Sequence, residues 1–474
     1  MLDKLRLSIA KASGKSASLL SKVGPGGGGN IPGYVFSRVG DNESISSLAS
    51  ELKYGSILVT GTNGKTTTTT LLIKLISQDV QIRRSYENNT IHSILTAMLK
   101  QDGDLGVFEY GIRNKEFGIP DKVQKLIDPV GVVYTTISPE HSQVNNVKNS
   151  FLAYYSAKTL LSKEMKRGVI VANCDDPRTA LIGLNKEKDV HVNYFGINIT
   201  DIEDFDSKPI KCPNCGEILK YSHNFLNHRG FYSCECGFKR PEPNVKLVGA
   251  ELNPDSWKLS IEGDLYNYAI SKNVQFSLEL NVPPFGLHNI YNTLASITAY
   301  ASFTPKVENI EKSVKNIFDN LDMSFIPPGR FEIISYDNKH IGIGQGDNGD
   351  AVKVNAMFIK PYCKDSVEFI FTTPDEYEDD IFRDQYEVVK SLNPDHVIVV
   401  PGRKSIDKAR EYYEIIKKDF ETADFYPLDY EEMDKRIEKL TELAKESKYE
   451  TIIMTGCGEE QAMWESIKRN FINR

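Results

Sequence analysis

The chain has 474 residues, which is enough for two or three domains because an average domain has about 150 residues. Hydrophobic residues make up 40% of the sequence, enough to form sizeable cores and to exclude general disorder. Its 57 basic and 65 acidic residues give a net charge of −8, which argues against nucleic-acid binding through a basic face. The sequence has neither a membrane-length apolar run nor the features of a signal peptide, so we expect no membrane span and a soluble, cytoplasmic protein.

The N-terminal region divides into a helix and a glycine-rich run. Residues 1–23 have the pattern of an amphipathic helix, and 24–30 contain five glycines. Consecutive glycines do not maintain regular structure. The run is therefore either a hinge or a backbone that approaches a ligand closely. We assign residues 1–50 to a short N-terminal segment with this linker.

An α/β pattern follows from residue 51. The apolar run 56–60 leads into a glycine-containing loop and then a helical stretch through Leu75. Further apolar runs, separated by helical lengths, lie at 105–108, 130–136 and 169–172. Such alternation predicts a parallel α/β sheet. We assign residues 51–326 to a central α/β domain, with a polar, cysteine-rich insert at 206–243.

The last third of the chain repeats the α/β pattern. Pro327-Pro328-Gly329 is typical of a linker, and charged helical segments separate the apolar runs beyond it, at 369–372, 396–400 and 451–455. The sequence therefore predicts a second, Rossmann-like α/β domain over 327–474.

The loop after the first strand carries the strongest motif of the chain. It reads Gly61-Thr62-Asn63-Gly64-Lys65-Thr66-Thr67. Its end matches the Walker A pattern, in which Lys65 would face the β- and γ-phosphates and the Thr66 hydroxyl would bind Mg²⁺. Backbone N–H groups at the start of a helix also favour an anion. The first glycine of the full pattern would fall on Val59, so the loop departs from a plain Walker A motif.

The loop resembles the signature loop of the Mur ligase superfamily, which includes the cell-wall peptide ligases and folylpolyglutamate synthase. Six further segments resemble motifs of that family and occur in the family's order. They lie at 107–111, 132–141, 155–161, 173–177, 286–292 and 328–332. Each match is weak by itself, but six ordered matches make chance agreement implausible.

The resemblance implies a magnesium site. In the family's pattern the ions are held by the loop hydroxyl, here Thr66, by Glu109 at the end of the next strand, and by His141. A lysine that most Mur ligases carry in carbamylated form corresponds to Lys158. A carbamate would suit Mg²⁺, whereas an unmodified lysine would repel it. Whether Lys158 is modified stays open at this stage.

The resemblance also implies a nucleotide site and a reaction. Asn173, His288 and Asn289 would contact ATP, and Arg330 would reach its phosphates from the hinge. Asp347 is the candidate for an acidic residue of the C-terminal domain, although 344–350 matches no family motif cleanly. In this family ATP phosphorylates a carboxylate and an amine then attacks the acyl phosphate. The implied catalytic residues are Lys65, Glu109, His141, Lys158, Arg330 and Asp347.

The seven cysteines fall into two groups. Cys174, Cys363 and Cys457 are isolated, as buried thiols commonly are. The other four lie within 25 residues of one another, at Cys212, Cys215, Cys234 and Cys236. In a cytoplasmic chain this clustering favours a metal over disulfides, and four thiolates predict a closed, structural Zn²⁺ site. Because the second pair is C-x-C, His223 or His228 could replace one ligand.

The insert resembles that of MurT, the ligase subunit of the enzyme that amidates cell-wall glutamate. Catalytic residues like those of MurE together with this insert would suit the pseudomurein peptide ligases of methanogenic archaea. We therefore expect a ligase that adds an amino acid to a nucleotide-linked or lipid-linked cell-wall peptide precursor. The alternative is a MurT-type subunit that needs a glutaminase partner. A nucleic-acid-binding zinc ATPase is a third reading, which the net charge disfavours.

Overall fold

Two units make up the chain, Met1–Phe325 and Ile326–Arg474, and each is described by itself. The computed structural model describes residues 2–21, 30–86, 90–112, 114–138, 150–200, 210–253, 256–283, 285–321, 329–363, 366–458 and 461–472. Most of the glycine run at 24–30, His141 and the Pro327-Pro328 pair lie outside these ranges.

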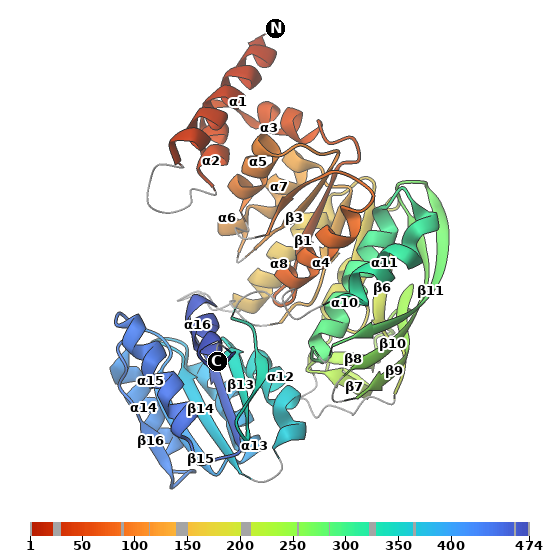
Figure 1. Ribbon diagram of the computed structural model, residues 1–474. Helices are drawn as coiled ribbons and strands as arrows, with labels where there is room; N and C mark the ends of the chain where they lie inside the picture. Colours follow the sequence, from red (N-terminus) through yellow and green to blue (C-terminus); the bar gives the residue numbers. More distant parts are fainter. Residues whose placement is uncertain are drawn as a thin grey trace. The chain divides into compact units, whose positions relative to one another are not determined.

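Within the described residues, the main sheet of the first unit has nine strands in the order β11-β10-β9-β6-β5-β4-β1-β3-β2 (Figure 1). The strands from β2 to β6 are parallel, and those at its centre are buried along their whole length, as expected for a sheet covered on both faces. They are β1 (Ser56–Thr60), β2 (Ile82–Ser85), β3 (Leu105–Glu109), β4 (Gly131–Tyr134), β5 (Val169–Asn173) and β6 (His191–Ile197).

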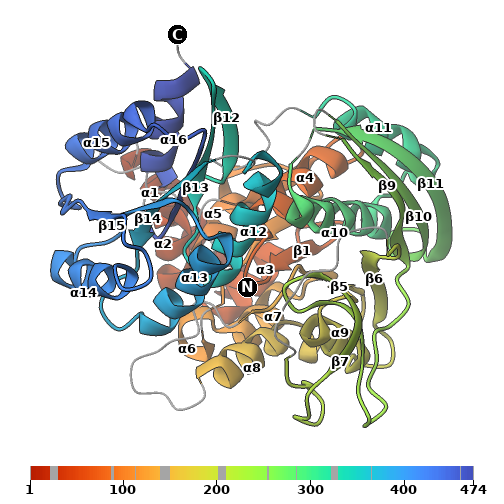
Figure 2. The ribbon, with the colours of Figure 1, turned by 90° about the horizontal axis from the view of Figure 1, so that it is seen from below.

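Helices cover both faces of this sheet (Figures 1 and 2). Helices α4, α10 and α11 pack together on one face, while α3, α5, α7 and α8 share the apolar core of the other. The helices are α3 (Asn42–Ala49), α4 (Lys65–Ile76), α5 (Ile91–Lys100), α6 (Lys115–Gly118), α7 (Pro120–Ile127), α8 (Ser150–Lys163), α9 (Pro177–Leu184), α10 (Leu287–Phe303) and α11 (Ile310–Phe318), with a 3₁₀ turn at Val307–Asn309.

Three strands that run antiparallel to one another extend the sheet beyond β6, and the sequence did not predict them. They are β9 (Val245–Leu252), β10 (Trp257–Asn267) and β11 (Lys272–Val282). Along β10 and β11 buried residues alternate with more exposed ones, because one face is covered and the other meets solvent. Two carboxylates accept hydrogen bonds from the edge strand: Glu311 of α11 from the Ser277 N–H, and Asp319, directly after α11, from the Asn281 N–H. These contacts occupy donors that an edge would otherwise offer to another chain.

The N-terminal helices α1 (Leu2–Ser21) and α2 (Ile31–Val39) pack on the same unit. The Gly33 N–H donates to the Thr96 hydroxyl of α5 at 2.9 Å. A side chain at position 33 would collide with the His92 carbonyl, so glycine allows α2 to lie close against α5.

The cysteine-rich insert forms a small hairpin. Its strands are β7 (Lys220–Leu226) and β8 (Arg229–Ser233), which pair antiparallel. Leu219, Tyr232 and Phe238 join the apolar core of the first unit. The insert is therefore packed into the central domain and shares its core.

The second unit contains a six-stranded sheet, among its described residues, in the order β12-β13-β17-β14-β15-β16, parallel except for the β12–β13 pair. This α/β architecture agrees with the fold class predicted for the C-terminal domain. Its elements are β12 (Glu332–Tyr336), β13 (Lys339–Gln345), α12 (Gly349–Ile359), a 3₁₀ turn (Lys360–Tyr362), β14 (Val367–Thr373), α13 (Asp379–Leu392), β15 (His396–Pro401), α14 (Ile406–Ile416), β16 (Ala423–Phe425), α15 (Met433–Glu446), β17 (Thr451–Gly456) and α16 (Gln461–Ile472).

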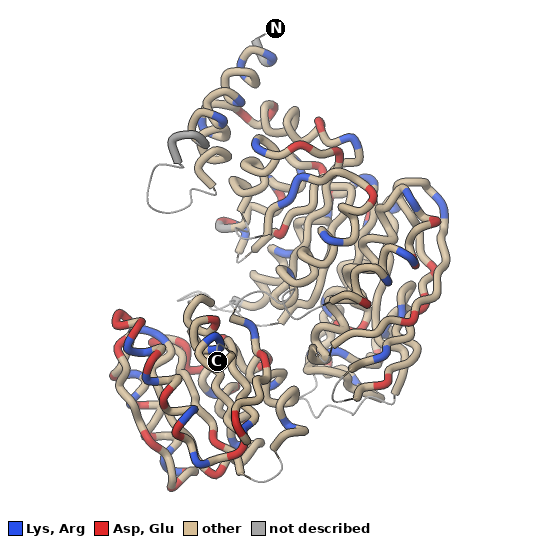
Figure 3. Tube along the Cα trace, in the orientation of Figure 1, with Lys and Arg blue, Asp and Glu red and all other residues tan. Residues whose placement is uncertain are grey.

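Charged residues of both signs are interspersed along each unit (Figure 3). The acidic excess is clearest in the second unit, where the segment 375–380 alone carries five carboxylates. Among the residues that the structure describes, no helix has both the length and the apolar character needed to cross a bilayer.

Candidate active site

The glycine loop joins the carboxyl end of β1 to the first turn of α4. Gly64 has a φ of +84°, and a Cβ there would lie 2.3 Å from the Asn292 amide oxygen of α10. Gly61 lies similarly close to Thr135, where a Cβ would lie 2.0 Å from the hydroxyl oxygen. Glycine is needed at both positions because neighbouring side chains fill the space that a Cβ would take. The loop thus packs between two other segments of the central domain.

Hydrogen bonds fix the conformation of this loop. Lys65 donates from Nζ to the Thr62 carbonyl at 2.7 Å, so its ammonium folds back over the loop. The Thr135 hydroxyl donates to the Asn63 carbonyl at 2.6 Å. Thr66 and Thr67 follow in the first turn of α4, where backbone N–H groups have no partner within the helix. Loop and helix start together form a cradle of the kind that binds phosphate.

Glu109 lies at the carboxyl end of β3, beside the strand that carries the loop. In the β1–β3 register it is opposite Val59, and its side chain is only 2% exposed. A buried carboxylate next to a phosphate-binding loop has the chemistry of a magnesium ligand. The structure thus places Glu109 and the loop at the carboxyl ends of two neighbouring strands.

Helix α8 places Tyr154 and Lys158 against the loop, one turn apart. The Tyr154 hydroxyl lies 2.8 Å from the Thr62 hydroxyl, and Lys158 donates from Nζ to the Gly61 carbonyl at 2.9 Å. Lys158 is 1% exposed, and its ammonium lies 4.6 Å from the centre of the Tyr154 ring. Burial, with a further contribution from the charge of Lys65, lowers the pKa of Lys158 well below its ordinary value.

Asn173 ends β5 and is fully buried. Its side-chain amide donates to the Thr135 carbonyl at 3.3 Å, so it supports the segment that contacts the loop. On α10, the Asn292 amide donates to Asn289 and the Asn289 amide donates to the Phe285 carbonyl. His288 is partly buried at the start of the same helix.

Two predicted residues, Arg330 and Asp347, belong to the second unit. Asp347 follows β13, and its carboxylate accepts hydrogen bonds from the Gln345 side chain and from the Gly458 N–H after β17. Burial raises the pKa of Asp347, although the charges of Arg403 and Arg330 oppose this. His141, the remaining predicted magnesium ligand, lies outside the described residues.

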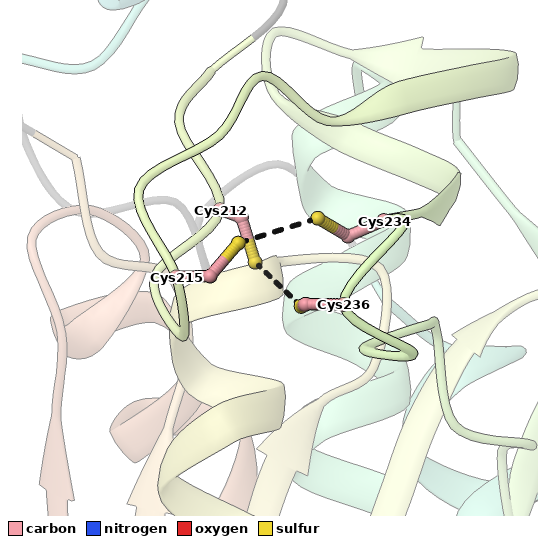
Figure 4. A group of neighbouring side chains, drawn as sticks. All are labelled: Cys212, Cys215, Cys234 and Cys236. Carbon is pink, nitrogen blue, oxygen red and sulfur yellow. Dashed lines mark hydrogen bonds between the residues drawn. The ribbon is translucent and has the colours of Figure 1, made fainter.

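The four cysteines of the insert converge (Figure 4). All four Sγ atoms lie within 4.8 Å of one another, with 3.9 Å between Cys212 and Cys236 and 3.5 Å between Cys215 and Cys234. A tetrahedral site with Zn–S distances of about 2.3 Å has edges of about 3.8 Å, so the spacing fits zinc.

The C-x-C spacing of the second pair does not prevent this geometry. Each pair forms a tight turn, in which the Gly216 N–H donates to the Cys212 carbonyl and the Gly237 N–H to the Cys234 carbonyl. The two histidines considered as substitutes lie elsewhere: His223 packs on the Phe225 ring, and His228 contacts Asp176.

Sequence reasoning missed several residues of this site. Tyr154, Thr135 and Thr136 contact the loop through hydrogen bonds that join segments more than 70 residues apart. Tyr154 immediately precedes the lysine segment that we identified, and its position one turn before Lys158 on a predicted helix is the signal that could have identified it.

Comparison with known proteins agrees with this geometry. Residues 59–229 match the model of the Mur ligase middle domain. The chain is 25% identical over 357 residues to the MurT subunit of lipid II isoglutaminyl synthase (glutamine-hydrolyzing) from Staphylococcus aureus, which covers 72% of this chain and 70% of that protein.

Solved structures share the fold over most of the chain. A pseudomurein peptide ligase type C from Methanothermus fervidus is 26% identical, with a TM-score of 0.66 over 90% of this chain and 80% of that one. MurF from Thermotoga maritima in complex with ADP has the same fold at 13% identity, with a TM-score of 0.57 over 91% of this chain and 82% of that one.

The phosphate loop, the middle-domain match over 59–229 and the fold together support a place for this chain in the Mur ligase superfamily. It is an ATP-dependent ligase that forms amide bonds. Among its relatives, those named above act in cell-wall synthesis, and the similarity extends through both units.

Proposed function

We propose that this protein adds an amino acid to a cell-wall peptide precursor, of murein or pseudomurein, through an acyl-phosphate intermediate. One observation carries the proposal. Glu109 and Lys158 are both buried, and both lie with the glycine loop at the carboxyl end of the central parallel strands. That arrangement provides a phosphate cradle beside a carboxylate and a lysine whose pKa is lowered, mainly by burial.

The reaction would proceed in two steps. A carboxylate oxygen of the precursor attacks the γ-phosphorus of ATP, and the bond to the β–γ bridging oxygen breaks, releasing ADP. The amino group of the incoming amino acid then attacks the acyl carbon, loses a proton to solvent, and expels inorganic phosphate. Lys65 would stabilise charge on the γ-phosphate, and Arg330 would do so from the second unit.

The donor set fits magnesium. Thr66, Glu109, His141 and a carbamate on Lys158 would be the ligands, and the ion would neutralise the negative charges of ATP and the precursor. Neutral lysine amines react with carbon dioxide, so the lowered pKa of Lys158 supports its carbamylation. Asn173, His288 and Asn289 would contact the nucleotide, and Asp347 is the proposed catalytic residue of the second unit.

The four cysteines would hold one structural Zn²⁺, since four thiolates leave no open position for a substrate. The precursor is expected to be nucleotide-linked or lipid-linked, and the enzyme to work in the cytoplasm.

The second candidate function is that of a MurT-type subunit, which would amidate a precursor with ammonia from a glutaminase partner. Its specific support is the 25% identity over 357 residues to the MurT subunit.

Purified protein should be incubated with ATP, Mg²⁺, cell-wall precursors and pooled amino acids, with glutamine plus a glutaminase as the parallel reaction. The proposal predicts precursor masses increased by an amino-acid residue in the first reaction. Products only in the second would establish the MurT-type function instead.

A further inference from the structure

The turn of the insert's hairpin is buried, although it is made of polar residues. Asn227, His228 and Arg229 are between 6% and 7% exposed. A surface hairpin would leave such a turn in water, and burying these groups costs free energy unless they find partners. His228 finds its partner in the central domain, on the turn after β5, while Arg229 donates to the Leu226 carbonyl and lies over the Tyr291 ring of α10.

His228 is linked to Asp176, which is fully buried. Its Nε2 lies 3.3 Å from Asp176 Oδ2. The same carboxylate accepts hydrogen bonds from the Ile137 N–H at 2.7 Å and the Thr136 hydroxyl at 2.9 Å. Burial alone would raise the pKa of Asp176, but His228 and Arg178 hold it below its usual range, so the carboxylate stays charged.

The segment that Asp176 holds at Thr136 and Ile137 contacts the phosphate loop through Thr136 and through Ser138. The Thr136 carbonyl accepts a hydrogen bond from the Thr62 N–H at 2.7 Å, and the Ser138 N–H donates to the Thr62 hydroxyl at 3.0 Å. Thr62 in turn accepts the hydrogen bond from Lys65. A continuous series of hydrogen bonds thus leads from the hairpin to the lysine of the loop.

A second link runs through the neighbouring aspartate. Arg240, which follows the second cysteine pair, donates from Nε to Asp175 Oδ1 at 2.6 Å. The other oxygen of Asp175 accepts from the Tyr291 hydroxyl of α10 at 2.9 Å. Tyr291 precedes Asn292, whose amide oxygen lies against Gly64 of the loop. The insert is therefore linked, through two consecutive buried carboxylates, to two segments that contact the loop.

We propose that the zinc-ribbon insert positions the nucleotide site, with His228 and Arg240 as positioning residues that act through Asp176 and Asp175. The proposal rests on the nucleotide site proposed above. It gives the insert a role in ATP binding in addition to its own folding. Because coupling between two sites is reciprocal, ATP binding should also stabilise the hairpin.

Hydrogen exchange of the full-length, zinc-loaded protein tests this coupling without a mutation. Adding β,γ-methylene-ATP should slow amide exchange in peptides from 130–138 and also in those from the hairpin, 220–233. Protection of 130–138 without protection of the hairpin would overturn the proposal. A wild-type protein that does not bind the nucleotide would instead refute the nucleotide site itself.

Variants of the hairpin provide the second test. His228→Phe removes the imidazole nitrogen that lies beside the Asp176 carboxylate and should weaken binding of the ATP analogue about tenfold or more, with zinc content unchanged. His228→Gln keeps an N–H donor and should restore most of the affinity. His223→Phe is the matched control, because His223 lies on the same hairpin but packs on Phe225. Equal affinity in His228→Phe and wild type, or equal weakening in the control, would contradict the positioning role.

Discussion

At the scale of single residues, the site contains two lysines in contrasting environments. Lys65 is partly exposed at the start of α4, where a phosphate can reach it, whereas Lys158 is enclosed by α8 and the loop. The sequence motifs predicted both positions. They did not reveal that Lys158 contacts Gly61, because that hydrogen bond joins residues 97 positions apart.

Lys65→Ala should reduce ATP turnover about a hundredfold to a thousandfold, the usual effect of removing one group that stabilises transition-state charge. The variant should keep the thermal unfolding transition of the wild type, because Lys65 is only partly buried. Lys74→Ala, an exposed lysine on the same helix, serves as the control. Near-normal turnover in Lys65→Ala, measured by ADP release, would show that the loop does not bind the reacting phosphates.

Lys158 should form a carbamate with bicarbonate in solution. Its lowered pKa increases the fraction of neutral amine, the form that attacks carbon dioxide, so the carbamate should already form at a pH well below the ordinary pKa of lysine. Carbon-13 NMR of protein equilibrated with labelled bicarbonate should show one buried carbamate signal that Lys158→Ala lacks. The same spectrum in both proteins would exclude this site of modification.

At the scale of secondary-structure elements, the parallel strands β1, β3, β4 and β5 fall close to where apolar runs predicted them. The strands β9, β10 and β11 were not predicted, because their alternation of buried and exposed residues lacks continuous apolar runs. The packing of the insert could not be predicted from the sequence either. The Asp176–His228 contact joins a turn to a polar hairpin about 50 residues further along the chain.

The insert should bind one zinc ion per chain, measured by elemental analysis of protein purified without chelator. Structural zinc contributes on the order of 10 kcal/mol to folding of small sites. Cys212→Ser combined with Cys215→Ser should therefore lose the metal and make the insert, 206–243, sensitive to protease. Cys363→Ser is the control, since Cys363 lies in the other unit. Protein that contains no zinc yet resists protease at the insert would contradict a structural metal.

At the scale of the whole molecule, the proposed reaction assigns different tasks to the two units. The loop, Glu109 and Lys158 lie in the first unit, and Asp347 and Arg330 in the second. The family motifs indicate the first group by several residues, because a phosphate cradle requires particular residues at fixed spacing. They indicate Asp347 less clearly, since 344–350 matches no family motif cleanly.

Asp347→Asn should separate these tasks. The variant should bind the ATP analogue as tightly as wild type, while amide formation falls by at least tenfold because a charged partner is lost. Calorimetry for the analogue and a coupled assay for the amide measure the two effects. Asp350→Asn, a nearby carboxylate at the start of α12, is the control. Loss of nucleotide binding in Asp347→Asn would contradict the assignment of different tasks to the two units.

The central claim is that ATP activates a carboxylate of the precursor as an acyl phosphate, and transfer of an oxygen label tests it directly. The precursor carboxylate is labelled with oxygen-18 and incubated with the purified protein, ATP, Mg²⁺ and the amino acid that gives product. The inorganic phosphate released is then analysed by mass spectrometry. The account predicts one labelled oxygen in each phosphate formed together with an amide bond. Amide product accompanied by unlabelled phosphate would contradict it.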